Sequence, residues 1–383
     1  MKVAFISNFL TLHQLPLAEE LYKQTNGNYR FVETIPMPGT FDKGGYADYS
    51  SLPWLIQLWK GDELKAEAYR WVQDADVVVS GGALGYLNWL KNRLDLGKLC
   101  FEMGERWLKR GWLNILSPRF LKWHLYYRLY FHNKLSYYLA ASGFSAGDLK
   151  KLHSYSGRTF KWGYFTRMPE IDIEKIMREK SNGKRLRCMH LSRMLKLKHQ
   201  ELVLQLAQRL MALGYDFEIN MYGSGPELKN YKTIMHELGV GDVVNFCGNI
   251  PNTEVFKEMQ MHHVFLFTSD RNEGWGAVIN EAMSNGCAVV CSDAVGSAPF
   301  LIKEGVNGLT FRSCDVDSLT EKVKLLFDNP RLRNELSVNA YRTMKEVWSP
   351  ANAASQFLKL SESLLQGKNP AIIEGPCSVA TPI

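Results

Sequence analysis

Two glutamates beside a glycine-rich turn are the first candidates for chemistry in this sequence. The stretch "NEGWGAVINEAMSNG" (272–286) holds Glu273 and Glu281, with seven residues between them. On one helix these acids would point in different directions, because eight residues turn about 80° past two full turns. If Glu273 lies in a loop and a helix begins near Gly276, both carboxylates and the free amides of the helix start surround one elongated ligand. Such a site suits an anion flanked by hydroxyl groups, as in a nucleotide sugar.

Two cations support this hypothesis. The segment "HLSRMLKLKHQELVLQL" (190–206) places Arg193 and Lys198 after a strand-like run, where a helix opens. Two cations there neutralise a diphosphate, and arginine offers a fork of donors. Gly223 opens "GSGPE", a tight turn after the next strand. A solvated helix start explains either cation alone, and a plain strand-to-helix connector explains the turn.

The elements that must position these residues are buried strands alternating with longer periodic segments. This alternation predicts an α/β protein with two Rossmann-like, doubly wound parallel-sheet domains facing a central cleft. Ligands of such sheets bind outside the carboxyl ends of the strands, where the glycine-bearing turns lie. The expected strands are 2–7, 29–35, 76–81, 98–103 and 137–142 in the N-terminal half, and 186–192, 217–223, 243–248, 264–269 and 288–293 in the C-terminal half.

The length of 383 residues suits two domains, each with its own core. We expect an acceptor-binding domain at 1–166, a nucleotide-sugar-binding domain at 167–348, a C-terminal helix at 349–366 that packs back on the first domain, and a poorly ordered tail at 367–383. The start "MKVAFISNFL" is typical of a strand and not of a signal peptide, and no apolar run reaches the roughly 18 residues of a membrane span. Seven cysteines without a CxxC pair indicate buried, reduced thiols in a cytoplasmic protein.

The C-terminal half also resembles a known family. The order "SRMLKLK", "YGSGPEL", "FCGNIPNTEV" and "LFTSDRNEGWGAVINEAMSNGCAVVCSDAVGSAPFLIKEGVNGLTF" looks like the family 4 (group 1) retaining glycosyltransferases of the GT-B fold, densely over 186–312. The match includes that family's E-x7-E motif. The resemblance implies retaining transfer of a sugar from a nucleotide diphosphate sugar, with a UDP sugar favoured and a GDP sugar possible. It implies no cofactor and no bound metal.

The resemblance also assigns roles to residues. Arg193 and Lys198 should grip the diphosphate, Glu273 the donor-sugar hydroxyls and Glu281 the ribose. The backbone of Gly274, Trp275, Gly276 and Ala277 should face the phosphates or sugar, Asn249 and Ile250 should touch the base, and Gly223 should lie at the donor. Two departures stand out: Ser192 replaces the glycine that usually precedes Arg193, and the loop 7–16 lacks the paired glycines often seen there.

Three further residues are candidates: His13, with Glu273, Arg193 and Lys198, for catalysis, and Glu102 and Glu105 for the acceptor side. His13 lies in the first loop, where it is either a structural histidine or a ligand for a phosphate or an acceptor hydroxyl. Glu102 and Glu105, in "CFEMGERWLKRG" (100–111), follow a strand; they either reach the acceptor or belong to a solvated turn.

The net charge of +7 is concentrated in the N-terminal half, where residues 1–166 hold 21 Lys and Arg against 14 Asp and Glu. Much of this surplus lies in 104–134, in which cations alternate with Trp, Tyr and Phe. We favour binding to an anionic membrane surface. A helical core element with snorkelling cations is the main alternative, and a nucleic-acid surface a weaker one.

Together these features predict a retaining glycosyltransferase on the cytoplasmic face of a membrane that builds a cell-surface polysaccharide or glycolipid from a saccharide or lipid-linked acceptor. The alternatives are a related enzyme with a soluble sugar acceptor and a catalytically silent nucleotide-sugar-binding protein. Intact Glu273, Glu281, Arg193 and Lys198 argue against a silent protein. A dehydrogenase is disfavoured, because no strand leads into GxGxxG with an acid about 20 residues later.

Overall fold

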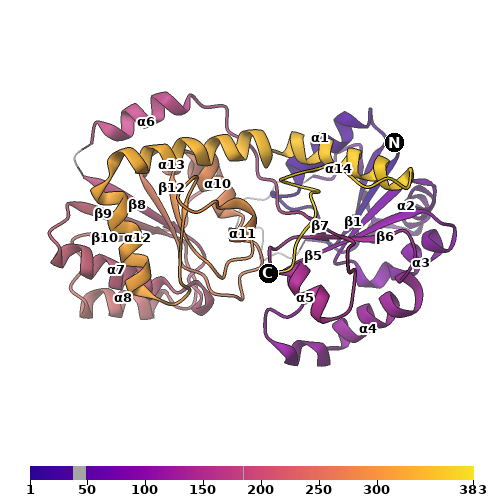
Figure 1. Ribbon diagram of the computed structural model, residues 1–383, viewed down its shortest axis with the longest axis horizontal. Coiled ribbons are helices and arrows are strands. Elements are labelled where there is room, and N and C mark those ends of the chain that lie inside the picture. The colour runs from indigo at the N-terminus through magenta and orange to yellow at the C-terminus, as the bar shows by residue number, and fades with distance from the viewer. Residues whose placement is uncertain (38–48, 184) are drawn as a thin grey trace. The chain divides into compact units, whose positions relative to one another are not determined.

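The computed structural model describes residues 1–37, 49–183 and 185–383. The chain divides into two compact units: unit 1 comprises Met1–Arg167 together with Val347–Ile383, and unit 2 comprises Met168–Glu346. Each unit contains one parallel sheet with helices on its two sides (Figure 1). Both sheets are therefore of the doubly wound kind that the alternating pattern predicts.

The sheet of unit 1 has seven strands in the order β3-β2-β1-β4-β5-β6-β7. The order reverses between β1 and β4, so the loops after these two strands lie at the switch point where such sheets bind ligands. The five predicted strands are present, but β3 and β7 were missed because each has only three residues. The strands are β1 (Val3–Ser7), β2 (Tyr29–Glu33), β3 (Leu55–Gln57), β4 (Val77–Gly81), β5 (Leu99–Gly104), β6 (Ser136–Ala140) and β7 (Thr159–Lys161).

The sheet of unit 2 has six strands in the order β10-β9-β8-β11-β12-β13. Its switch point lies between β8 and β11, the strands that precede Arg193 and Glu273 in the sequence. The five predicted strands are again present, and the three-residue β13 was missed. The strands are β8 (Leu186–Leu191), β9 (Phe217–Tyr222), β10 (Val244–Gly248), β11 (Val264–Phe267), β12 (Ala288–Ser292) and β13 (Leu309–Phe311).

Helices cover both sheets. In unit 2, α7, α8 and α12 lie on one side of the sheet, and α6, α10 and α13 on the other (Figure 1). The helices of unit 1 are α1 (Leu15–Gln24), α2 (Asp62–Asp74), α3 (Leu87–Asp95), α4 (Pro118–Tyr126), α5 (Ser145–Lys151) and α14 (Pro350–Leu365), with short turns η2 (Leu58–Lys60), η3 (Leu84–Tyr86), η4 (Trp112–Leu116) and η5 (Tyr127–Phe131). Those of unit 2 are α6 (Ile173–Ser181), α7 (Gln200–Ala212), α8 (Leu228–Glu237), α9 (Asn252–Met261), α10 (Val278–Ser284), α11 (Ala298–Leu301), α12 (Val316–Asp328) and α13 (Pro330–Arg342), with η6 (Lys196–Lys198) and η7 (Thr343–Val347).

The C-terminal segment completes unit 1. Ser349 caps α14 by accepting a hydrogen bond from the amide of Asn352, and the helix packs against α1. Its Phe357 lies between Phe101 and Trp162, with ring centroids 5.5 and 5.7 Å away. Apolar residues that recur every three or four positions explain this docking, because they form one buried stripe along the helix.

The expectation of a poorly ordered tail was wrong. The amide of Cys377 donates to the carbonyl of Lys161, the amide of Lys161 to Ser378, and the amide of Ala380 to Thr159. The tail thus pairs with β7, the edge strand of the sheet, and satisfies backbone groups that an edge leaves open. Composition alone suggested disorder because these partners lie more than 200 positions earlier in the chain.

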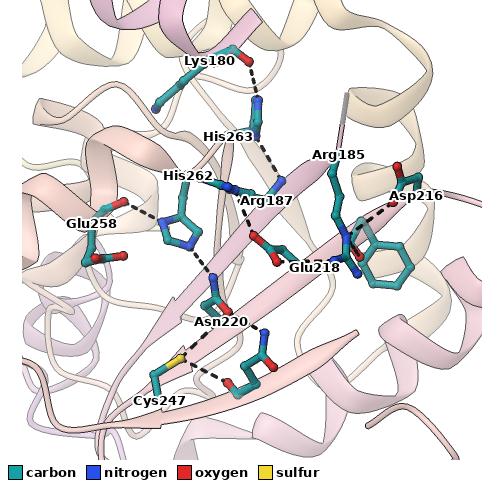
Figure 2. Close-up of polar contacts among 12 residues, drawn as sticks. Lys180, Arg185, Arg187, Asp216, Glu218, Asn220, Cys247, Glu258, His262 and His263 are labelled. Atoms are coloured by element: carbon teal, nitrogen blue, oxygen red, sulfur yellow. Dashed lines mark hydrogen bonds and ion pairs between the residues drawn. The ribbon is translucent and has the colours of Figure 1, made fainter. Parts of the chain in front are cut away.

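Two buried histidines, in the link between α9 and β11, make hydrogen bonds to α6, β8 and β9 (Figure 2). His263 accepts from the amide of Arg187 through Nδ1 (3.1 Å) and donates to the carbonyl of Lys180 through Nε2 (2.8 Å). One acceptor and one donor define a neutral imidazole, and burial lowers the pKa of His263 to about 4. The Nε2 atom of His262 lies 3.0 Å from the side-chain amide nitrogen of Asn220 on β9. These contacts fix β8 and β9, whose far ends carry Arg193 and Gly223.

Candidate functional site

A lysine and a glutamate meet at the switch point of unit 2. Lys198 ends η6, after β8, and Glu273 lies in the loop after β11. The Nζ of Lys198 donates to Oε2 of Glu273, and the two side chains are only 14% and 15% exposed. The same Nζ lies 5.0 Å from the ring centroid of Phe267. The two residues are 75 positions apart in the sequence and meet because β8 and β11 are neighbours in the sheet.

Further hydrogen bonds join the loops that carry this pair. The hydroxyl of Thr268 donates to the carbonyl of Lys198 (2.6 Å), and the amide of Asp270 donates to Leu197 (2.9 Å). His199 lies 2.6 Å from a carboxylate oxygen of Glu201 and 3.3 Å from one of Asp270. The hydrogen bond to Glu201 raises the pKa of His199, against the opposing effect of its partial burial. These supporting residues were not predicted, because none of them forms a recognisable motif.

Arg193 is placed differently from Lys198. It lies in the turn between β8 and η6, and its side chain is exposed. Within residues 1–37, 49–183 and 185–383, its guanidinium makes no hydrogen bond or ion pair, whereas Lys198 is paired. The two predicted phosphate ligands therefore lie on one turn, one already neutralised by an acid and the other open to an anion.

Close backbone packing fixes this turn. Gly223 has φ of +119°, and a Cβ atom placed there would lie 2.0 Å from the carbonyl oxygen of Ser192. A Cβ at Gly225 would lie 2.4 Å from the carbonyl oxygen of Met194. Only glycine allows such an approach at these two positions. The GxG of "GSGPE" is thus more than a connector, because it seats the β9 turn on the turn that bears Arg193.

The serine that departs from the family pattern has a structural explanation. The Oγ of Ser192 lies 2.9 Å from Nε2 of His190 and 2.9 Å from Nε2 of Gln200. Burial lowers the pKa of His190 to about 4, so its ring is neutral and hydrogen-bonds to Ser192 and to the carbonyl of Leu266. The serine side chain is held inside the turn by these partners.

Asn249 and Ile250, the predicted base contacts, follow β10. Asn249 is exposed and Ile250 is partly buried. The amide of Gly223 donates to the carbonyl of Gly248 (2.7 Å), so the turns after β9 and β10 are neighbours. The structure thus brings the turns of Arg193, Gly223 and Asn249 together along one edge of the sheet.

The loop and helix that carry the two glutamates are arranged as the sequence predicted. The helix α10 begins at Val278, so Glu273 lies in the loop and Glu281 in the helix. Trp275 is 1% exposed and donates through Nε1 to the side chain of Asn280 (2.9 Å). Gly276 has φ of +82° and packs beside Phe267. Because the indole of Trp275 is buried, this residue can offer a ligand only its backbone.

The part of the chain that forms this site matches a known family. Residues 172–343 match the model described as glycosyl transferases group 1. Residues 172–343 belong to the glycosyl transferases group 1 family. This group 1 domain contains every donor-side residue predicted from the sequence, from Arg193 to Glu281.

Relatives and solved structures extend the comparison. The chain is 28% identical over 199 residues to a GDP-mannose-dependent alpha-(1-6)-phosphatidylinositol monomannoside mannosyltransferase of Mycolicibacterium smegmatis, covering 50% of this chain and 52% of the relative. It is 30% identical over 127 residues to the lipopolysaccharide core biosynthesis mannosyltransferase LpcC of Rhizobium leguminosarum bv. viciae, covering 33% and 35%. The alignments thus span about half or less of these curated relatives. Anabaena HepE in complex with UDP superposes with a TM-score of 0.70 at 17% identity, over 96% of this chain and 100% of that one. The fold is GT-B.

Glu281 of the group 1 domain has an unusual ionisation. Its carboxyl group is partly buried on α10, and burial raises the pKa from 4.5 to about 7. Between these two pH values the folded protein holds a proton that the unfolded chain has released. Stability from this group is therefore highest below pH 4.5 and is lost as the pH rises through about 7.

We expect Glu281→Gln to stabilise the unliganded protein by up to about 3 kcal/mol at about pH 8, and to have little effect near pH 4.5. The glutamine is neutral in both states, so it escapes the cost of burying a charge. Urea unfolding of parent and variant across this pH range measures the difference. Glu237→Gln, at an exposed position on α8, is the control. It should leave the free energy of unfolding unchanged both at about pH 8 and near pH 4.5. A pH-independent difference for Glu281→Gln would contradict the raised pKa.

In unit 1, His13 and Glu105 approach the same tyrosine. The hydroxyl of Tyr164 donates to Oε1 of Glu105 (3.1 Å), and the rings of Tyr164 and His13 have centroids 6.3 Å apart. These residues follow β1, β5 and β7, so all three lie at the carboxyl edge of the sheet. Burial lowers the pKa of His13 to about 4, so its imidazole is neutral and suited to hydrogen bonding with hydroxyls more than to holding a phosphate.

Glu102 is buried within unit 1. It is 5% exposed within β5, and it accepts hydrogen bonds from Nε1 of Trp123 (2.9 Å) and the hydroxyl of Tyr155 (2.5 Å). Burial raises its pKa to about 7. Its placement favours a structural role, because strand alternation turns its side chain into the core under α4 while Glu105 lies beyond the strand end.

No group of three or more His, Cys, Asp or Glu in residues 1–37, 49–183 and 185–383 is arranged to hold a metal ion. Nor does any helix in this part of the chain combine the length and apolar composition needed to cross a bilayer. All seven cysteines are free, with Cys247 and Cys314 exposed and the other five buried.

Proposed function

We propose that this protein transfers a sugar, with retention of configuration, from a nucleotide diphosphate sugar to a saccharide or lipid-linked acceptor. The observation that carries the proposal is the Lys198–Glu273 pair at the switch point of unit 2, beside the open guanidinium of Arg193. Lys198 can bind a diphosphate in place of Glu273, and the carboxylate of Glu273 can then accept hydrogen bonds from a sugar. The pair therefore suits a ligand in which a diphosphate lies next to a sugar. The match of residues 172–343 to the group 1 family supports the same activity.

In this mechanism the bound ligand replaces the ion pair between Lys198 and Glu273 with its own contacts to both residues. The diphosphate takes Lys198 from Glu273 and is also bound by Arg193, and the released carboxylate of Glu273 accepts hydrogen bonds from hydroxyls of the donor sugar. Both cations then stabilise the negative charge that grows on the leaving diphosphate. Glu281 binds the ribose. The acceptor attacks on the face that the diphosphate leaves, and a phosphate oxygen takes its proton, so no protein nucleophile and no metal ion is needed.

The donor and the acceptor follow from different observations. The relative from Mycolicibacterium smegmatis is named for GDP-mannose, whereas Anabaena HepE was solved with UDP, so GDP-mannose and UDP-glucose both belong in the first ligand panel. The acceptor is a glycolipid or polysaccharide intermediate, as the names of both curated relatives suggest by analogy. Synthesis takes place on the cytoplasmic face of a membrane.

The two glutamates should have separable roles. Glu273→Gln should lower sugar transfer at least tenfold while leaving the affinity for the free nucleoside diphosphate unchanged or higher, because it removes the competitor for Lys198. Glu281→Gln should weaken that nucleotide about tenfold or more at about pH 8, since a hydrogen bond to a charged group contributes about 1.5–3 kcal/mol. Calorimetry with GDP and UDP, and turnover with the matching nucleotide sugar, measure both effects.

The same experiment separates the proposal from its competitors. If Glu273→Gln weakens the nucleotide and Glu281→Gln spares it, the two acids have been assigned to the wrong ends of the ligand. Tight binding of a nucleotide sugar without turnover, across acceptors, would identify a silent binding protein. Assays with EDTA should match those without it, and loss of activity would reveal a metal requirement.

A further inference from the structure

The basic segment contains a helix that is apolar on two sides. Helix α4 continues directly into η5, and together they cover 118–131. Their inner side is aromatic and packs against the rest of unit 1: Trp123 donates to Glu102 of β5 (2.9 Å), and the rings of Tyr127 and Tyr155 have centroids 4.5 Å apart. The buried residues of this inner side recur three or four positions apart and are Phe120, Trp123, Tyr127 and Phe131. The main alternative to membrane binding, a helical core element, therefore holds for this side.

The outer side is apolar as well. Leu121, Leu125 and Leu129 are spaced four residues apart, so they form a row along the helix. Trp112, Leu113 and Leu116 of the preceding η4 are also exposed. These six residues, here called the leucine face, are each 55–80% exposed. An exposed row of apolar residues of this kind marks a surface that binds another surface.

The charges beside the leucine face have one sign. Residues 106–134 contain no Asp or Glu. Some of their cations are already used: Arg106 pairs with the buried Asp148, and Lys109 pairs with Glu105. Arg110, Lys122 and Arg128 are exposed, and none of them makes an ion pair with any residue that the structure describes. The free positive charge thus lies next to the exposed leucines.

We propose that the leucine face enters the interfacial region of an anionic lipid bilayer, with Arg110, Lys122 and Arg128 binding its headgroups. Apolar side chains flanked by cations complement both layers of such a surface. Single-stranded nucleic acid would need several exposed aromatic rings for stacking, but of the eight Trp, Tyr and Phe residues in 104–134 four are buried, three are partly buried and one, Trp112, is exposed, beside five exposed leucines. A symmetric second copy would bring like charges together. This proposal rests on the proposed function. It identifies the part of unit 1 that binds the membrane in which a lipid-linked acceptor would lie.

The test is vesicle binding by flotation, with no turnover involved. The vesicles are phosphatidylcholine alone or mixed with phosphatidylglycerol, at low salt and at about 1 M salt, where the Debye length is about 3 Å. The leucine variant combines L121Q, L125Q and L129Q. The control combines L96Q, L213Q and L325Q, three leucines exposed elsewhere on the described surface. A charge variant combines R110Q, K122Q and R128Q, and leaves the paired Arg106 and Lys109 intact.

We expect the parent and the control to bind the anionic vesicles, with part of this binding surviving high salt. The leucine variant should bind at least tenfold more weakly and lose the salt-resistant part, while the charge variant should lose the preference for anionic lipid. Circular dichroism and nucleotide binding should be unchanged in every variant, so failure of the donor assignment would be seen separately. Equal losses in the leucine variant and the control, or a parent that does not bind vesicles, would overturn the proposal. So would a concentration-dependent dimer that the leucine variant dissociates.

Discussion

Replacing Lys198 by alanine should lower turnover at least about 30-fold, equivalent to about 2 kcal/mol of transition-state stabilisation. The diphosphate would lose a cation, and Glu273, only 15% exposed, would be left without its partner. The unliganded protein should also become less stable, because removing one member of a largely buried pair leaves the other charge uncompensated. Turnover, calorimetry with the nucleoside diphosphate and urea unfolding measure the three effects.

Arg193→Ala should lower turnover and nucleotide affinity comparably but leave stability unchanged, because its side chain is exposed and has no ion pair among the described residues. Lys196→Ala is the matched control, since this exposed lysine lies on the same turn and has no assigned role. If the Arg193 and Lys198 variants both retain activity within about threefold of the parent, under about 0.7 kcal/mol, the diphosphate does not bind at this turn.

Replacing Gly223 by alanine should destabilise the protein by about 3 kcal/mol or more and abolish donor binding. The new Cβ would lie 2.0 Å from the carbonyl oxygen of Ser192, a backbone atom that cannot rotate away. The cost combines an unfavourable φ of +119° with overpacking, which contribute about 1–3 kcal/mol each. Because the amide of Gly223 also binds Gly248, the shift would reach the turn that bears Asn249.

Gly239→Ala separates these two causes. Gly239 has φ of +65°, but nothing lies within 4 Å of the position its Cβ would occupy. This variant should therefore show only the backbone cost, about 1–2 kcal/mol. Thermal and urea unfolding of both variants give the comparison. If both variants lose the same stability, the close approach of Gly223 to Ser192 adds no cost beyond the unfavourable φ angle.

Most strands were predictable because they are buried on both faces. The run Val77–Val79 within "DVVVSG" is continuously apolar, which distinguishes it from the amphipathic helices around it. The three strands that were missed, β3, β7 and β13, have three residues each and give no such run. The pairing of the tail with β7 was missed for another reason, since backbone hydrogen bonds between distant segments leave little trace in side-chain composition.

In the candidate site, too, the local features were predictable from the sequence and the contacts between distant residues were not. The spacing of Glu273 and Glu281 around Gly276 was enough to place one acid in a loop and the other in a helix, because glycine interrupts the helix period. That Trp275 turns its indole into the core, and that Ser192 binds His190 and Gln200, depends on neighbours from other strands. Sequence spacing gives no information about such partners.

The sequence by itself determined the alternation of strands and helices, the turn that carries Arg193, the loop and helix that carry Glu273 and Glu281, and the sign of the charge in 104–134. These features are local, since they depend on periodicity, glycine positions and composition. Only the tertiary structure decided that Lys198 pairs with Glu273, because β8 and β11 become neighbours through the strand order of the sheet. It alone also decided which side of α4 is covered. Apolar residues lie on two sides of this helix, so the sequence does not show which side is covered. Trp123 donates to Glu102 of β5 and the ring of Tyr127 lies against that of Tyr155, which leaves Leu121, Leu125 and Leu129 facing the solvent.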